Sequence, residues 1–228
     1  MQTSRSAVVP LLLLFWCPAM ALAAPKTHTV TLGPSRHVPY TPPEANAGNK
    51  SEEDTTLRVR PLLIDGAQRE WTVGEIHDVT DRTFVVRRAL RIDDSLPQEA
   101  PRWTWQPGPW LMVDRSTGHI TALHLPAFDP EVSEAIWFRD YAAYCGIATT
   151  VKNGGLVAVV AELSSRKAVV QKVIGPWPQP NAPHPACATS KWQRMPMRAT
   201  IQPTGGEAMT FDVVGLSSLV EEGEATEP

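Results

Sequence analysis

Hydrophobic and polar residues alternate along most of the chain after residue 57, with the period of two that is typical of β-strands. The strongest signal is a predicted hairpin that joins residues 57–64 to 68–73 through the two-residue turn Asp65-Gly66. Further hairpins are predicted where a short turn-forming loop separates two apolar runs: 110–114 with 119–125, 155–161 with 167–173, and 192–202 with 208–214. The pattern predicts about ten to twelve strands and at most one helix.

Proline positions refine this prediction. Pro61 cannot donate a backbone hydrogen bond, so its strand is expected at a sheet edge or beside a bulge. The sequence Pro107-Gly108-Pro109 is expected to turn the chain into the hairpin that follows it. Residues 175–186 have a proline at nearly every second position. They are expected to form an extended crossover or, alternatively, a ligand for an aromatic groove.

Residues 129–146 are compatible with two structures. Asp129 and the two residues after it have the pattern of a helix start, and Gly146 would end that helix. The aromatic-rich runs 134–138 and 141–145 instead suit two strands and a turn, which we favour. The predicted fold is a single all-β domain of hairpins and meanders, arranged as a sandwich or a propeller-like sheet, with at most one short helix near 130–145.

Residues 134–173 resemble one blade of a β-propeller. Trp137, Asp140 and Tyr144 lie where such blades carry an inner-strand tryptophan, a turn aspartate and an aromatic residue. The pattern is not repeated elsewhere in the sequence. The resemblance implies a β-meander over these residues and no particular activity.

The first 23 residues have the pattern of a secretory signal peptide, with Arg5, the apolar segment 7–16 and the small-x-small sequence at 21–23. Cleavage after Ala23 would leave the protein secreted or periplasmic, and no later segment is long and apolar enough to span a bilayer. The predicted organisation is a signal peptide at 1–23, an extended, largely disordered linker at 24–56, an all-β domain at 57–216 and a disordered acidic tail at 217–228.

Within the predicted linker, two parts differ. Residues 27–32 alternate between polar and apolar types and are expected to form a short edge strand. From residue 33 to residue 56, several prolines and a polar, charged stretch argue against regular structure.

The chain is mildly acidic, with a formal net charge of −3, and loss of Arg5 with the signal peptide makes it one unit more negative. This balance argues against nucleic acid as the main partner, because phosphate binding needs a clustered basic surface. The nearest approach to such a cluster is interpreted as a solvated strand face: Arg82, Arg87, Arg88 and Arg91. Of these, Arg88 shares the predicted apolar face of residues 84–92 and should reach solvent or a carboxylate.

Two cysteines, Cys145 and Cys187, follow the predicted cleavage site. In an oxidising compartment such a pair is expected to form one disulfide. The alternative is a reactive thiol at Cys145, which would need a base that the neighbouring sequence does not supply.

Few residues match known catalytic patterns. The sequence has no Gly-x-Ser-x-Gly elbow, phosphate-binding loop, His-Glu-x-x-His or Cys-x-x-Cys, and it predicts neither a metal site nor a cofactor. His119 and His124 are five residues apart on one predicted strand, so they point to opposite faces. Asp114 could meet His119 across a hairpin, although both border a loop, where polar residues are common.

The tryptophans are better candidates for a binding site. Seven of the eight follow the predicted signal peptide, and most are expected in the core because a buried indole contributes strongly to packing. Trp103 and Trp105 share one side of an extended segment beside the proline-rich turn. They could form a flat platform for a sugar ring or an aromatic group, with core packing as the alternative. Together with Trp110 they are the predicted binding residues.

Two functions remain compatible with the sequence. The first is an exported, non-enzymatic β module that binds a glycan or a protein of the cell envelope or extracellular space. The second is a small secreted hydrolase with dispersed catalytic residues. A pocket containing His119 or His124 with Asp114 or Asp129 would favour the hydrolase. An exposed aromatic ledge at Trp103 and Trp105 would favour the binding module.

Overall fold

The computed structural model describes residues 27–40, 56–149, 154–177 and 184–213. In these residues all regular structure is β, arranged in three antiparallel sheets, so the all-β prediction is confirmed. The described part of the chain therefore has no helix with the length and apolarity needed to cross a membrane. The predicted signal peptide and acidic tail lie outside the described residues, as do residues 178–183 of the predicted crossover.

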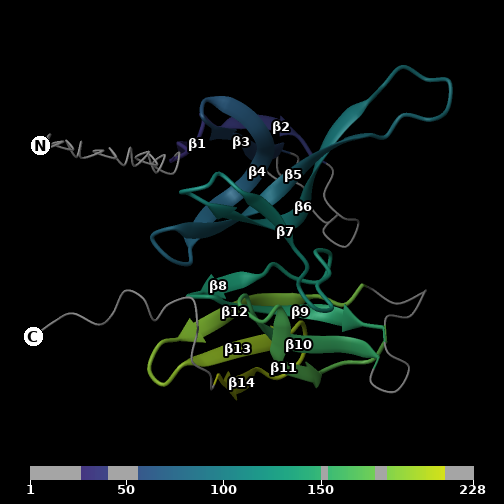
Figure 1. Cartoon of the computed structure of the whole chain (residues 1–228). Coiled ribbons are helices and arrows are strands. Elements are labelled where there is room, and N and C mark those ends of the chain that lie inside the picture. The colour runs from purple at the N-terminus through teal and green to yellow at the C-terminus, as the bar shows by residue number, and fades with distance from the viewer. Residues whose placement is uncertain (1–26, 41–55, 150–153, 178–183, 214–228) are drawn as a thin grey trace, which may run out of the picture.

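The first sheet contains the seven N-terminal strands in the order β1-β3-β4-β5-β6-β7, with β2 beside β3 (Figure 1). They are β1 (Val30–Leu32), β2 (Arg36–Pro39), β3 (Thr56–Ile64), β4 (Ala67–Asp78), β5 (Thr83–Asp93), β6 (Trp103–Asp114) and β7 (Ile120–Leu123). The sheet curls so that its N-terminal strands approach β6. The backbone nitrogen of His28 donates to the carbonyl oxygen of Ser116 at 3.1 Å, and Tyr40 forms an isolated bridge with Trp105.

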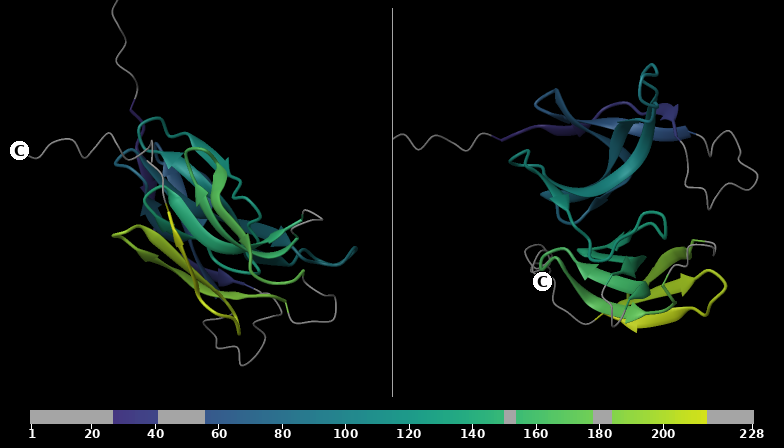
Figure 2. Two further views of the ribbon diagram at one scale, coloured as in Figure 1. Left: turned by 90° about the horizontal axis from the view of Figure 1, so that it is seen from below. Right: turned by 90° about the vertical axis from the view of Figure 1, so that its right-hand side faces the viewer.

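The second and third sheets are smaller. The second is a four-stranded meander in the order β11-β10-β9-β8: β8 (Ile136–Phe138), β9 (Tyr141–Ala148), β10 (Gly155–Glu162) and β11 (Lys167–Val173). The third has the order β12-β13-β14: β12 (Cys187–Gln193), β13 (Arg198–Pro203) and β14 (Met209–Asp212). Residues 134–173 thus contain the meander that the propeller resemblance implies. The sheets are stacked as layers, so of the two predicted arrangements the sandwich is the one observed (Figure 2).

The second sheet is the middle layer, and both of its faces are covered (Figure 2). One set of side chains packs against the first sheet: Ala142, Tyr144, Val157 and Val159. The alternate set packs against the third sheet: Ala143, Cys145, Leu156 and Val160. A strand buried on both faces has no polar face, which explains why β9 and β10 are nearly continuous apolar runs.

Several local predictions are confirmed. Asp65 and Gly66 both have positive φ, 53° and 76°, as a two-residue hairpin turn requires. Pro61 lies between the part of β3 that pairs with β2 and the part that pairs with β1, and a bulge follows at Leu62/Leu63. The favoured strands at 134–138 and 141–145 correspond to β8 and β9, and residues 129–135 before them form no helix. Arg88 reaches a carboxylate, since its Nε lies 2.8 Å from Glu70 Oε2.

The prediction of a turn at Pro107-Gly108-Pro109 is wrong, because β6 runs through it from Trp103 to Asp114. The ladder between β5 and β6 shifts register between Arg87 and Ala89, which accommodates the three residues. On its other side β6 pairs with β7 only over Trp110–Val113. The missing proline N–H groups therefore do not interrupt a central ladder.

Within the predicted linker 24–56, the expectation that residues 33–56 lack regular structure is wrong for β2. Pro34 precedes β2 and Pro39 ends it, so neither proline interrupts the strand. Val38 is buried in a cluster with Val59, and this contact holds β2 on β3. The expectation of a short edge strand at 27–32 is confirmed by β1.

The predicted single strand 192–202 is wrong, because these residues belong to two strands, β12 and β13.

Cys145 and Cys187 form the predicted disulfide, with 6.3 Å between their Cα atoms. The bond links β9 of the middle sheet to β12 of the third. Cys145 is completely buried, so the alternative of a reactive thiol is wrong.

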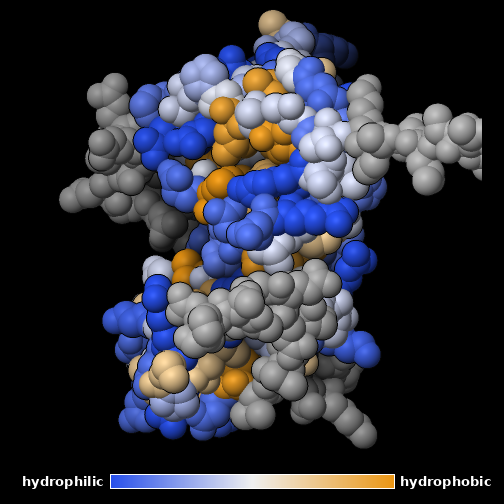
Figure 3. All heavy atoms as spheres, turned by 60° about the vertical axis from the view of Figure 1, so that its left-hand side comes forward, coloured by the Kyte–Doolittle hydropathy of each residue, from blue (hydrophilic) through white to orange (hydrophobic). Residues whose placement is uncertain are grey.

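Surface hydrophobicity is uneven. On the face shown in Figure 3, hydrophobic residues gather mainly over the upper half, which contains the first sheet, and hydrophilic residues surround them. Several large apolar side chains of this sheet and its projecting hairpin are exposed: Ile76, Ile92, Leu96 and Trp103. Other large apolar side chains are exposed outside the first sheet: Val169, Val173, Trp177 and Met195.

Candidate functional site

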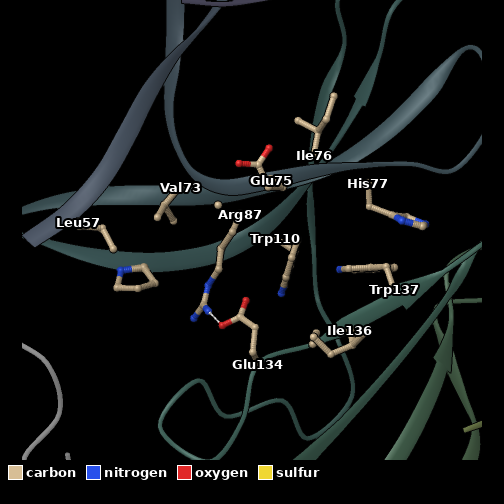
Figure 4. Close-up of a pocket in the computed structure, with 13 residues that line it drawn as sticks. Leu57, Val73, Glu75, Ile76, His77, Arg87, Trp110, Glu134, Ile136 and Trp137 are labelled. Carbon is tan, nitrogen blue, oxygen red and sulfur yellow. Dashed lines mark hydrogen bonds and ion pairs between the residues drawn. The ribbon is translucent and has the colours of Figure 1, made fainter. Parts of the chain in front are cut away.

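A bulge in β4 shapes the candidate site. Pairing of β4 with β5 stops at Val73↔Arg87 and resumes at His77↔Val85, so residues 74–76 lie outside the ladder. Gly74 has a φ of 78°, a conformation that glycine adopts without steric cost. The bulge overhangs a cleft of about 440 Å³ between the first sheet and the segment that leads into β8 (Figure 4). This volume is within the range of small-molecule sites.

The cleft has an apolar end and an aromatic end. In Figure 4, Leu57 and Val73 lie on one side of Arg87, and Trp137 and His77 lie on the other. Glu134 faces Arg87 from the opposite wall. A ligand would therefore meet aliphatic side chains, then a charged pair, then aromatic rings.

Arg87 is the most constrained polar residue of the site. Its side chain is only 6 % exposed; Nη1 pairs with Glu134, and Nε donates to the carbonyl oxygen of Gly108 at 3.1 Å. Its Nη2 is buried and has no hydrogen-bond partner among the described residues. The interpretation of Arg87 as part of a solvated face is therefore wrong, because the segment before β8 covers that face of β5.

Two tryptophans form the aromatic end. Trp110 and Trp137 pack edge to face, with ring centroids 5.3 Å apart. Trp137 also stacks on His77 at 6.1 Å, and His77 Nε2 donates to the carbonyl oxygen of Arg139 at 2.7 Å, which fixes the imidazole. Neither indole N–H has an acceptor within the described ranges.

Three N–H groups of one cleft, on Arg87, Trp110 and Trp137, thus have no acceptor in the part of the chain that the structure describes. Buried polar groups are normally hydrogen-bonded, and each unsatisfied one costs about 1–3 kcal/mol. The three nitrogens are shielded by neighbouring side chains. A ligand therefore reaches them only when a neighbouring side chain moves aside. The cleft is suited to a ligand that brings hydrogen-bond acceptors.

The charges in the cleft offset each other. Burial raises the pKa of Tyr40, and the nearby Arg87 lowers it while Glu134 raises it, so the hydroxyl senses both charges. Arg87 and Glu134 pair with each other, and Glu75, the other carboxylate that lines the cleft, is 73 % exposed and lies 3.6 Å from Arg58 and 3.9 Å from Arg60. A ligand group beside Arg87 therefore meets a compensated charge pair. This arrangement favours a neutral ligand over an ion.

No protein-family model, curated protein or solved structure matches this chain. Its function is therefore inferred from its own residues.

The three predicted binding residues lie in different environments. Trp110 lines the cleft. Trp105 is 5 % exposed and packs edge to face on Trp71, with ring centroids 5.5 Å apart. Trp103 is 46 % exposed and carries Arg91 over its ring at 4.3 Å. Trp103 and Trp105 do not form one exposed platform, because Trp105 is buried and only Trp103 is exposed.

The residues considered for a hydrolase do not come together. His119 and His124 are exposed, and neither lines the cleft. Asp114 is engaged by Arg82 and by Ser116. Asp129 lines a second hollow, of about 520 Å³, whose walls include neither histidine. Within the described ranges, no three His, Cys, Asp or Glu side chains gather in a way that could hold a metal ion.

Sequence reasoning missed Arg87, Glu134 and His77 as site residues. Arg87 and Glu134 are 47 residues apart, and alternation along one strand does not show what covers it. Trp137 was recognised only as a blade-like tryptophan. The sequence did contain a signal for Arg87. Side chains alternate along a strand, so Arg87 lies on the same face as the apolar Val85 and on the opposite face from Arg88, which indicates that Arg87 is covered.

Proposed function

We propose that this protein is an exported, non-catalytic module that binds an envelope or extracellular glycan in the cleft beside Trp110 and Trp137. The observation that carries the proposal is the group of three buried N–H donors without acceptors among the described residues. Hydroxyl and ring oxygens of a neutral sugar supply acceptors, and the faces of aromatic rings pack against its C–H groups. The offset charges of Arg87 and Glu134 support a neutral ligand over an anionic one.

Two observations support export. The first 23 residues have the pattern of a signal peptide. The Cys145–Cys187 disulfide is the kind of bond that persists in oxidising compartments. We expect intact-mass spectrometry of the exported protein to show an N-terminus at Ala24. An N-terminus at Met1 in protein recovered from outside the cytoplasm would contradict cleavage.

The binding proposal is tested by titrating the mature protein with a panel of neutral oligosaccharides while following tryptophan fluorescence and heat. We expect saturable binding, because a ligand that reaches the cleft changes the surroundings of Trp110 and Trp137. Trp137→Phe retains an aromatic ring but removes the N–H donor, and should weaken binding roughly tenfold. Trp103→Phe is the matched control and should bind like the wild type.

Two outcomes would overturn the proposal. One is an absence of binding to every oligosaccharide of the panel. The other is a loss of binding in Trp103→Phe and not in Trp137→Phe, which would move the site to the projecting hairpin. The hydrolase alternative gains no support from the structure, because neither His119 nor His124 lines either hollow.

A further inference from the structure

The cleft offers an acceptor beside its three donors. Glu134 uses Oε2 for its pair with Arg87, and its side chain is 47 % exposed. A carboxylate has about four lone-pair sites on its two oxygens, so Glu134 can accept a further hydrogen bond from a ligand. A small ligand group that both accepts and donates would therefore match this part of the cleft.

Charge narrows the choice of that group. A ligand carboxylate near Arg87 would also face Glu134, and like charges in contact are strongly unfavourable. An ammonium could donate to Glu134 but could not accept from the Arg87 guanidinium or from the two indole N–H groups, so these three donors would stay without acceptors. A neutral secondary amide avoids both conflicts, because its carbonyl accepts and its N–H donates.

The apolar end of the cleft adds a requirement for a small hydrophobic group. Leu57 and Val73 lie on one side of Arg87, and the Trp137 ring lies on the other (Figure 4). A ligand with an amide at Arg87 would therefore place an apolar substituent against Leu57 and Val73 and a ring against Trp137. An acetamido group on a sugar ring has these three parts in this order.

On this basis, and resting on the glycan-binding function proposed above, we propose that the sugar held in the cleft is an N-acetylated amino sugar. Its acetamido carbonyl accepts from the buried N–H donors of Arg87 and Trp110, and its N–H donates to Glu134. Its methyl group packs against Leu57 and Val73, and its ring lies beside Trp137, whose N–H donates to a ring hydroxyl.

The test compares three trimers of the same linkage on the mature protein by calorimetry. They are β-1,4-linked N-acetylglucosamine, its deacetylated form glucosamine, and glucose. We expect the acetylated trimer to bind at least about tenfold more tightly than the other two. Equal binding of the acetylated and the glucose trimers would overturn the acetamido assignment and leave the glycan-binding function intact. Absence of binding by these trimers and by the wider neutral panel would overturn both.

A variant pair tests the assigned acceptor. In Glu134→Gln a single oxygen must serve both Arg87 and the ligand, so the preference for the acetylated trimer should fall at least about threefold. Glu131→Gln changes an exposed glutamate of the same segment outside the cleft and should keep the wild-type preference. Circular dichroism melts establish that both variants are folded. A folded Glu134→Gln protein with the full preference would overturn the role of Glu134.

Discussion

Trp103 and Trp105 show how differently two residues of one strand face contribute to stability. Trp105→Ala should lower the free energy of unfolding by about 3–5 kcal/mol, because it leaves a cavity beside Trp71. Trp103→Ala should cost less than about 1 kcal/mol, because this residue is 46 % exposed. Urea denaturation of the two variants measures both values. Equal losses would contradict the difference in burial.

A second residue-scale prediction concerns pH. Burial opposes ionisation of Asp114, but hydrogen bonds from Arg82 and Ser116, together with the backbone N–H groups of residues 116 and 117, outweigh it. They hold the pKa of Asp114 well below its usual range. Since the folded-state pKa lies below the unfolded value of about 3.9, the stabilisation is present above that pH and is lost as the pH falls towards the folded pKa.

Asp114→Asn should therefore be less stable than the wild type by about 1–3 kcal/mol at neutral pH. The difference should shrink at pH values below about 4, where the unfolded wild-type carboxyl is protonated. Urea denaturation of both proteins at several pH values measures this change. A difference that does not vary with pH would show that the charge of Asp114 does not contribute.

At the scale of the element, β9 depends on a close approach at Gly146. A Cβ atom at this position would lie 1.9 Å from the backbone oxygen of Ala127, and Ile147 N donates to that same oxygen at 2.9 Å. Gly146→Ala should therefore separate β9 from the segment around Ala127, which precedes β8. We expect this to destabilise the protein by about 3 kcal/mol. Gly205→Ala is a control, because Gly205 has a φ of 74° with open space around it and should cost only about 1 kcal/mol. Similar melting temperatures for the two variants would contradict the importance of this contact.

At the scale of the whole molecule, the Cys145–Cys187 disulfide covalently links the third sheet to the middle sheet. Cys145 and Cys187 are 42 residues apart, so the bond restricts a long loop of the unfolded chain. Replacing both cysteines by alanine should lower the free energy of unfolding by about 4 kcal/mol. Guanidinium denaturation of the oxidised protein and the double variant gives this value. An unchanged midpoint would mean that the buried cluster shared by the two sheets, which includes Val160 and Ile201, holds them together without the bond.

The sequence by itself determined much of the secondary structure and the covalent link. Turn residues such as Asp65-Gly66 place the hairpins because few other residues adopt positive φ cheaply. The two cysteines of the predicted mature chain leave only one intramolecular pairing. The strands at 129–146 could be favoured over a helix because aromatic residues suit a pleated surface. The hairpins and strands depend on interactions that are local in the sequence, whereas the disulfide follows from the number of cysteines alone.

Tertiary structure alone decided which faces are covered and where the site lies. A period of two identifies the two faces of a strand but does not say whether solvent or another sheet lies against either. The segment that leads into β8 covers the face of β5 that carries Arg87, so this arginine lies in the cleft and not in solvent as alternation predicts. Trp105 is buried against Trp71 and Trp103 is exposed, a difference that alternation along the strand does not reveal. Arg87 and Glu134 meet only when the layers stack, since their pairing depends on packing between segments 47 residues apart.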